Sequence, residues 1–108
     1  MRRALLLTAT RPEPLRAVLD SWLQVRELEH WPLHIQIDPM GSDTDEVIEL
    51  SREFPSARIT VNPRAYGYVQ SQRIGLERLF VQRRYDFVFG IRDDIEAVSY
   101  THLRAHET

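Results

Sequence analysis

The sequence contains no cysteine, no lysine and no long apolar run. The absence of cysteine excludes disulfides, thiolate zinc sites and cysteine nucleophiles. No apolar segment is long enough to span a membrane, and the stretch from Met1 to Leu7 is too short for a secretory signal. We therefore expect a cytoplasmic protein without a membrane span. A peripheral attachment of a longer parent protein to a membrane stays open.

Charge and composition bound the function only loosely. All 14 basic residues are arginine, and with 16 acidic residues they leave a formal net charge of -2. A balance this close to neutral gives no support for nucleic acid or an anionic membrane as a partner. We attribute the arginine preference to GC-rich coding. A chain of 108 residues that is 43% hydrophobic and 28% charged fits one globular domain, small for an α/β enzyme.

Four short apolar segments have the character of strands. Residues 4–9 form a continuous apolar run, which is typical of a central strand covered on both faces. Residues 33–37 alternate apolar and polar, so we expect a strand that is less completely buried. Residues 57–61 also alternate and are expected nearer an edge, and residues 87–91 form the fourth strand.

Three helical patterns separate these strands. Thr10 followed by Pro12 and an acid is a helix-start signature, and Ser42 or Asp43 can cap the second helix. The third helix is expected from Tyr68 to about Arg83. It contains Gly75, which costs about 1 kcal/mol relative to alanine unless the helix lies close to a strand. In that helix Val69, Leu76, Leu79 and Phe80 are expected inward and Gln70, Gln72, Arg78 and Gln82 outward, and Trp22, Trp31 and Phe80 are expected in the core.

The alternation of strands and helices predicts an α/β fold. Right-handed crossovers give a three-layer, mostly parallel sheet of about four strands with helices on both faces, a Rossmann-like arrangement. The carboxyl ends of parallel strands meet at one rim. We expect that rim to collect the segment from Thr8 to Arg11, Asp38, Asp93 and Asp94.

The segment from Tyr85 to Glu96 carries the clearest chemical signal. It is a β-branched and aromatic run that ends in the pair Asp93 and Asp94. Open α/β sheets bind ligands at such strand ends, and two adjacent carboxylates require a compensating cation, either a divalent metal or a basic partner. A solvated turn after the strand is the alternative interpretation.

Four features in this order resemble the nucleotide-sugar-binding half of GT-A-type glycosyltransferases. They are the first strand ending at residues 8–12, residues 35–38 followed by residues 41–43, residues 62–67 and then 71–76, which are similar to the family's glycine-led helix, and the acidic strand of residues 87–96. The apolar Ile95 after the acids is similar to the N-acetylglucosaminyltransferase branch of that family. The resemblance covers residues 4–97.

Two positions depart from the family pattern. Arg92 stands where that branch has a third acid, and Arg73 stands where many relatives have asparagine. Arg92 either binds phosphate directly or weakens the metal site, and the sequence leaves both interpretations open.

The resemblance implies a metal-dependent enzyme that binds a nucleotide-sugar donor, such as a uridine diphosphate sugar. Asp94 would be the principal ligand of manganese or magnesium, with Asp93 helping to orient the sugar or metal-bound water. Asp38 would accept a hydrogen bond from the base or ribose, while Arg11 and Thr8 would lie near the diphosphate. A turn or capping role for Asp38 and a surface salt bridge for Arg11 are the alternatives.

The sequence identifies neither the acceptor, a glycan or another molecule, nor a catalytic base. We expect both to belong to parts of a longer protein beyond residue 97. The chain by itself is therefore expected not to transfer sugar.

Residues 98–108 change character completely. This tail resembles the in-frame translation of a transposase sequencing-library adapter, which implies a partial glycosyltransferase domain at residues 1–97 and a non-native tail at residues 98–108. His102 and His106, spaced i and i+4, would otherwise point to a zinc site.

A non-catalytic doubly wound module, receiver-like or for assembly, is the competing hypothesis. Receiver domains carry their acidic pair after the first strand, where this chain has Thr8, Ala9 and Thr10, and they need a late lysine, which this chain lacks. An assembly domain on the same scaffold stays open.

Overall fold

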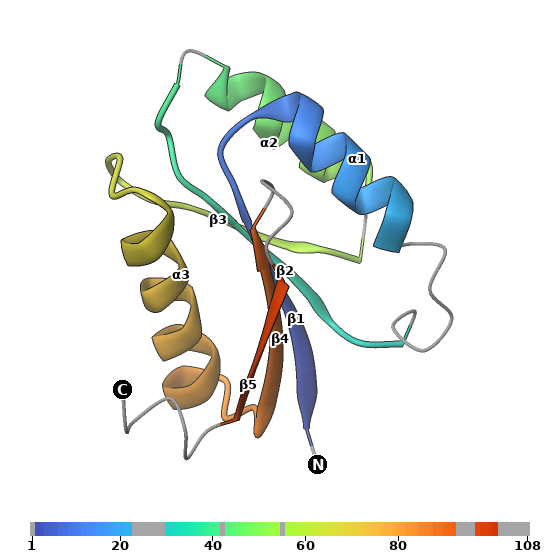
Figure 1. Cartoon of the computed structure of the whole chain (residues 1–108), viewed down its shortest axis with the longest axis vertical. Helices are drawn as coiled ribbons and strands as arrows, with labels where there is room; N and C mark the ends of the chain where they lie inside the picture. Colours follow the sequence, from blue (N-terminus) through green and yellow to red (C-terminus); the bar gives the residue numbers. More distant parts are fainter. Residues whose placement is uncertain (1, 23–29, 42, 55, 93–96, 102–108) are drawn as a thin grey trace.

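A computed structural model describes residues 2–22, 30–41, 43–54, 56–92 and 97–101. Within these residues the chain alternates strands and helices, as the sequence predicts (Figure 1). The elements are β1 (Arg3–Ala9), α1 (Pro12–Trp22), β2 (Leu33–Ile37), α2 (Thr44–Arg52), β3 (Arg58–Val61), α3 (Tyr68–Glu77), the π-helical η2 (Arg78–Gln82), β4 (Phe87–Arg92) and β5 (Ala97–Thr101).

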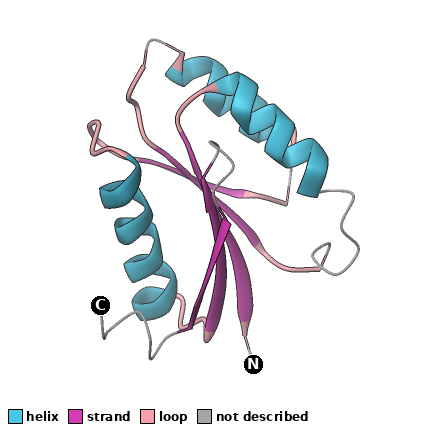
Figure 2. Ribbon diagram, in the orientation of Figure 1, coloured by secondary structure: helices cyan, strands magenta, loops and turns pink. Residues whose placement is uncertain are grey.

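The described strands form one sheet in the order β3-β2-β1-β4-β5. The first four strands are mutually parallel, with β1 at the centre and β3 at an edge, which confirms both predictions for these strands. Helices α1 and α2 cover one face of the sheet and α3 covers the other (Figure 2). The predicted three-layer, Rossmann-like α/β fold is therefore confirmed.

Strand β5 is an addition to the predicted fold. The sequence predicted no element at residues 97–101, yet they pair antiparallel with β4, from Ala97 opposite Ile91 to Thr101 opposite Phe87. The adapter origin of residues 98–108 stays a prediction, and residues 102–108, including His102 and His106, lie outside the described residues.

Two apolar cores lie on opposite faces of the sheet. Side chains alternate along β1, so Leu7 and Ala9 enter the core under α1 and α2, while Ala4 and Leu6 enter the core under α3. Both faces of β1 are covered, which explains its continuous apolar sequence. The first core also contains Leu15, Val18, Leu19, Ile35, Ile37, Val47, Leu50 and Ile91, and the second Leu79, Phe80, Tyr85 and Val88.

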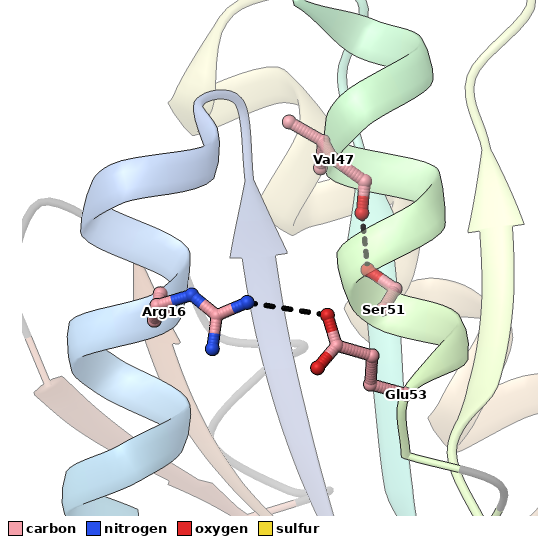
Figure 3. A network of polar contacts seen from close by, with 4 residues as sticks. All are labelled: Arg16, Val47, Ser51 and Glu53. Carbon is pink, nitrogen blue, oxygen red and sulfur yellow. Dashed lines mark hydrogen bonds and ion pairs between the residues drawn. The ribbon is translucent and has the colours of Figure 1, made fainter.

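An exposed ion pair joins α1 to the end of α2, and a buried side-chain hydrogen bond lies within α2. Arg16 Nη2 lies 3.2 Å from Glu53 Oε2, and Ser51 Oγ donates to the Val47 carbonyl within α2 at 2.9 Å (Figure 3). The two charged side chains are 56% and 57% exposed. A pair this accessible to water contributes little to stability.

The polar residues of β2 are buried, so the expectation of a less completely buried strand is wrong. His34 and Gln36 are only 2% and 1% exposed. They lie on the α3 side of the sheet, where Arg78 of η2 donates to Gln36 and the hydroxyl of Tyr85, after η2, lies 3.2 Å from His34 Nε2. Alternation here marks a buried polar face that neighbouring elements satisfy.

Helix α3 begins at Tyr68 as predicted, and Leu76, Leu79 and Phe80 pack inward as expected, but two other residues do not lie as expected. Val69 is 76% exposed, whereas Arg78 is half-buried, so both predicted orientations are wrong. The phase of the helix is set by Gly75, because a Cβ at this position would lie 3.1 Å from both Leu6 methyl carbons. This close approach confirms the predicted reason for a glycine inside the helix, and it turns Ser71 and Arg78 inward.

The aromatic predictions have mixed outcomes. Phe80 is buried as expected. Trp31 is only partly buried and packs edge-on against Phe87, with ring centroids 5.8 Å apart. The side chain of Trp22 lies outside the described residues. No helix in the described part of the chain is both long enough and apolar enough to cross a membrane.

Candidate functional site

The carboxyl ends of β1, β2 and β4, at Thr10, Asp38 and Arg92, form the edge of the sheet that we call the carboxyl rim. From β1 the chain runs through α1 on one face to β2, and from β3 it runs through α3 on the other face to β4. Connections therefore leave the central strands on opposite faces. In open α/β sheets this switch point leaves a crevice between neighbouring strand ends, where ligands bind.

Three side chains from three elements meet at this switch point. Thr10 Oγ1, after β1, lies 2.7 Å from the hydroxyl of Tyr68, the first residue of α3. The Arg92 guanidinium, at the end of β4, lies 5.2 Å from the centre of the Tyr68 ring. A cation above an aromatic face is attracted by the ring quadrupole. The group thus combines two hydroxyls with one positive charge.

Asp38, at the end of β2, is fully buried and organises the loop between β3 and α3. Its Oδ1 accepts hydrogen bonds from Asn62 Nδ2 and the Tyr66 amide, both at 2.8 Å, and its Oδ2 accepts from the Gly67 amide at 2.9 Å. Gly67 adopts a φ of 87°, which favours glycine. These contacts match the turn role that was the alternative for Asp38. A direct contact to a nucleoside stays a prediction.

Thr8 lies in β1, two residues before Thr10, and is fully buried. It pairs with Gln36 on one side and Arg92 on the other. Within the described part of the chain its Oγ1 has no hydrogen-bond partner. Buried hydroxyls are normally paired, so this atom marks an incompletely satisfied place beneath the rim.

Arg11 lies apart from this group. Its side chain is exposed, and it lines a groove between α1 and α2 on the other face of the sheet. The groove is rich in acids, and its remaining lining residues are Pro12, Glu13, Pro14, Arg16, Ala17, Asp20, Asp43, Glu46, Glu49, Leu50 and Glu53. The structure thus brings Thr8 and Asp38 to one face and places Arg11 at the start of α1.

Asp93 and Asp94, the predicted metal ligands, lie outside the described residues. In sequence they directly follow Arg92, the last residue of β4. Among the described residues no three histidine, aspartate or glutamate side chains are grouped so that they could hold a metal ion. Because the oxygens of Asp38 already accept three hydrogen bonds, the predicted metal site depends on the acidic pair.

Sequence reasoning missed Tyr68 and Asn62 as site residues. Tyr68 was expected only as the start of a helix, and Asn62 only as part of a loop. The available signal was Gly67, since a glycine directly before a helix allows the backbone to turn sharply there.

The sequence matches no known protein-family model, and no curated protein matches it significantly.

Proposed function

We propose that the carboxyl rim binds the diphosphate of a nucleotide-sugar donor and that the chain is the donor-binding part of a GT-A-type glycosyltransferase. The observation that carries this proposal is the meeting of Thr10, Tyr68 and Arg92 at the switch point, directly before the acidic pair in sequence. The resemblance of residues 4–97 to that family supplies the reaction class.

The described residues suit an anion. An arginine guanidinium offers several N–H donors to phosphate oxygens, and the hydroxyls of Thr10 and Tyr68 can donate as well. We therefore favour direct phosphate binding for Arg92 over the interpretation that it weakens a metal site. Asp38 contributes by placing Gly67 and the start of α3, next to the proposed diphosphate position.

A divalent cation would be held by Asp94 and Asp93, as the resemblance implies. When bound, such a cation neutralises the charge that develops on the diphosphate as the sugar leaves. Arg92 would share that charge from the protein side and orient the diphosphate against the rim.

Titration of uridine diphosphate into the protein tests this function, with and without manganese. We expect uridine diphosphate to bind only with manganese, and in Asp94→Ala manganese should no longer affect its binding. Asp45→Ala is the matched control, because it removes one exposed acid in the first turn of α2. The 108-residue chain is expected to show no sugar transfer, and detectable turnover would contradict that expectation.

A non-catalytic binding module is the second candidate. It is favoured by Asp38, whose carboxylate is occupied within the protein. A wild-type protein that is indifferent to nucleotides, with or without manganese, would support this module and refute the donor site.

A further inference from the structure

A chain of buried and partly buried hydrogen bonds connects η2 to the loop that directly precedes Tyr68. Arg78 Nη1 donates to Gln36 Oε1 at 2.6 Å, Gln36 Nε2 donates to Asn62 Oδ1, and Asn62 Nδ2 donates to Asp38 Oδ1 at 2.8 Å. Gln36, Asn62 and Asp38 are 1%, 4% and 0% exposed. Asp38 then accepts the amides of the loop.

The chain has one direction, because its two ends differ chemically. A guanidinium can only donate hydrogen bonds, and a carboxylate can only accept them. Arg78 therefore turns the oxygen of the Gln36 amide toward itself and its nitrogen toward Asn62. The same logic orients Asn62, which presents its nitrogen to Asp38 and also to Ser71 Oγ at 2.8 Å. Both intermediate amides have a single favoured orientation.

Burial of the Arg78 guanidinium costs desolvation free energy, and its place in this hydrogen-bond chain gives a reason for that cost. In the described part of the molecule Arg78 makes no ion pair, and its Nη2 is buried without a hydrogen-bond partner. Desolvation lowers the pKa of Arg78, and nearby Arg83 lowers it further. An apolar side chain of similar length would avoid this desolvation. The arrangement adds directionality to the hydrogen-bond chain, and an apolar residue cannot supply it.

We infer that Arg78 is a positioning residue for the candidate site: through Gln36, Asn62 and Asp38 it holds the Tyr66–Gly67 backbone and thereby the start of α3. Helix α3 has 10 residues, so Arg78 acts over about 15 Å along the helix axis. The hydrogen-bond chain stands on the contacts alone. Its consequence for a ligand rests on the proposed donor site.

Amide hydrogen exchange tests the inference without any ligand. Arg78→Met keeps the apolar stem and removes the donors, so Gln36 loses its fixed orientation and the loop opens more easily. We expect the amides of Tyr66 and Gly67 to exchange faster by on the order of tenfold, as for the loss of one hydrogen bond to a charged group. Core amides of β1 should keep their wild-type protection.

Arg73→Met is the matched control. It makes the same replacement in α3, which runs directly into η2, but Arg73 is exposed and its 3.6 Å pair with Glu77 lies at the surface. This variant should leave the exchange of Gly67 unchanged. Arg78→Lys retains a group that only donates, and it should restore part of the lost protection.

The inference would be overturned if the Gly67 amide of Arg78→Met exchanged at the wild-type rate. It would also be overturned if Arg73→Met increased that rate as much as Arg78→Met does. If Arg78→Met does not fold, Arg78→Lys against Arg73→Lys gives the same comparison with smaller changes. Uridine diphosphate titration then separates the two proposals. A wild-type protein that ignores the nucleotide refutes the donor site, while the exchange data still decide the role of Arg78.

Discussion

Acidification should destabilise the protein through His34. The ring is 2% exposed and its Nε2 lies 3.2 Å from the Tyr85 hydroxyl. Burial, and after it the positive charges of Arg78, Arg58 and Arg83, lower the pKa of His34 from 6.5 to about 4. The folded state therefore favours the neutral ring. The stability contributed by the neutral His34 ring should be fully present above pH 6.5 and should be lost as the pH falls toward 4.

The size of this loss follows from the two pKa values. Between pH 6.5 and about pH 4 the unfolded chain binds a proton at His34 that the folded chain does not bind. Each pKa unit corresponds to about 1.4 kcal/mol, so the loss is about 2 kcal/mol at pH 5 and approaches about 3 kcal/mol below pH 4. A domain of this size has a stability of roughly 5–15 kcal/mol, so the change is a substantial fraction of the total.

Urea unfolding at pH 7.5 and pH 5 of wild type and His34→Phe measures this term. Phenylalanine preserves a ring against Tyr85, whose centroid lies 5.5 Å from that of His34 in an edge-on contact, and it cannot be protonated. Wild type should lose about 2 kcal/mol more than the variant between the two pH values. His30→Gln, at an exposed position, is the control and should behave as wild type. Equal pH dependence of wild type and His34→Phe would refute the reasoning.

Two further substitutions test the packing of α3 and the loop before it. Gly75→Ala should destabilise the protein by about 1 kcal/mol in urea unfolding, because the new methyl would lie 3.1 Å from Leu6 and the cost of this crowding should exceed the gain in helix propensity. A higher urea midpoint would contradict this. Asp38→Asn should cost about 2 kcal/mol, because an amide nitrogen would face one of the N–H groups that the carboxylate accepts, including that of Gly67; an unchanged thermal midpoint would show that the loop does not depend on these bonds.

Asp38 illustrates that residue type and position alone do not decide between a ligand-binding and a structural role. An acid after a strand at the carboxyl rim is equally expected for a ligand contact and for a turn. The difference lies in the donors around it, which come from Asn62, Tyr66 and Gly67, more than 20 residues later in the chain. Local sequence contains no information on which donors the fold will bring to the carboxylate.

Arg78 shows that local sequence also does not determine whether a charged side chain is buried. Helical periodicity placed it on the outer face with Gln70 and Gln82, because charged residues are rarely buried. The close approach of Gly75 to Leu6 rotates the helix so that Arg78 faces β2 instead. A buried charge is tolerated there because Gln36 accepts its hydrogen bond.

The sequence by itself determined the order of β1 to β4 and the helices between them, but not β5. It also determined the central place of β1, the edge position of β3 and the need for glycine in α3, because these depend on hydrophobic periodicity and local backbone preference. Only the tertiary structure decided that the polar side of β2 is buried, that Arg78 turns inward, and that Thr10, Tyr68 and Arg92 meet at the switch point. The physical reason is that hydrogen bonds between residues distant in the chain depend on how helices and strands are set against one another, and a local pattern does not contain that geometry.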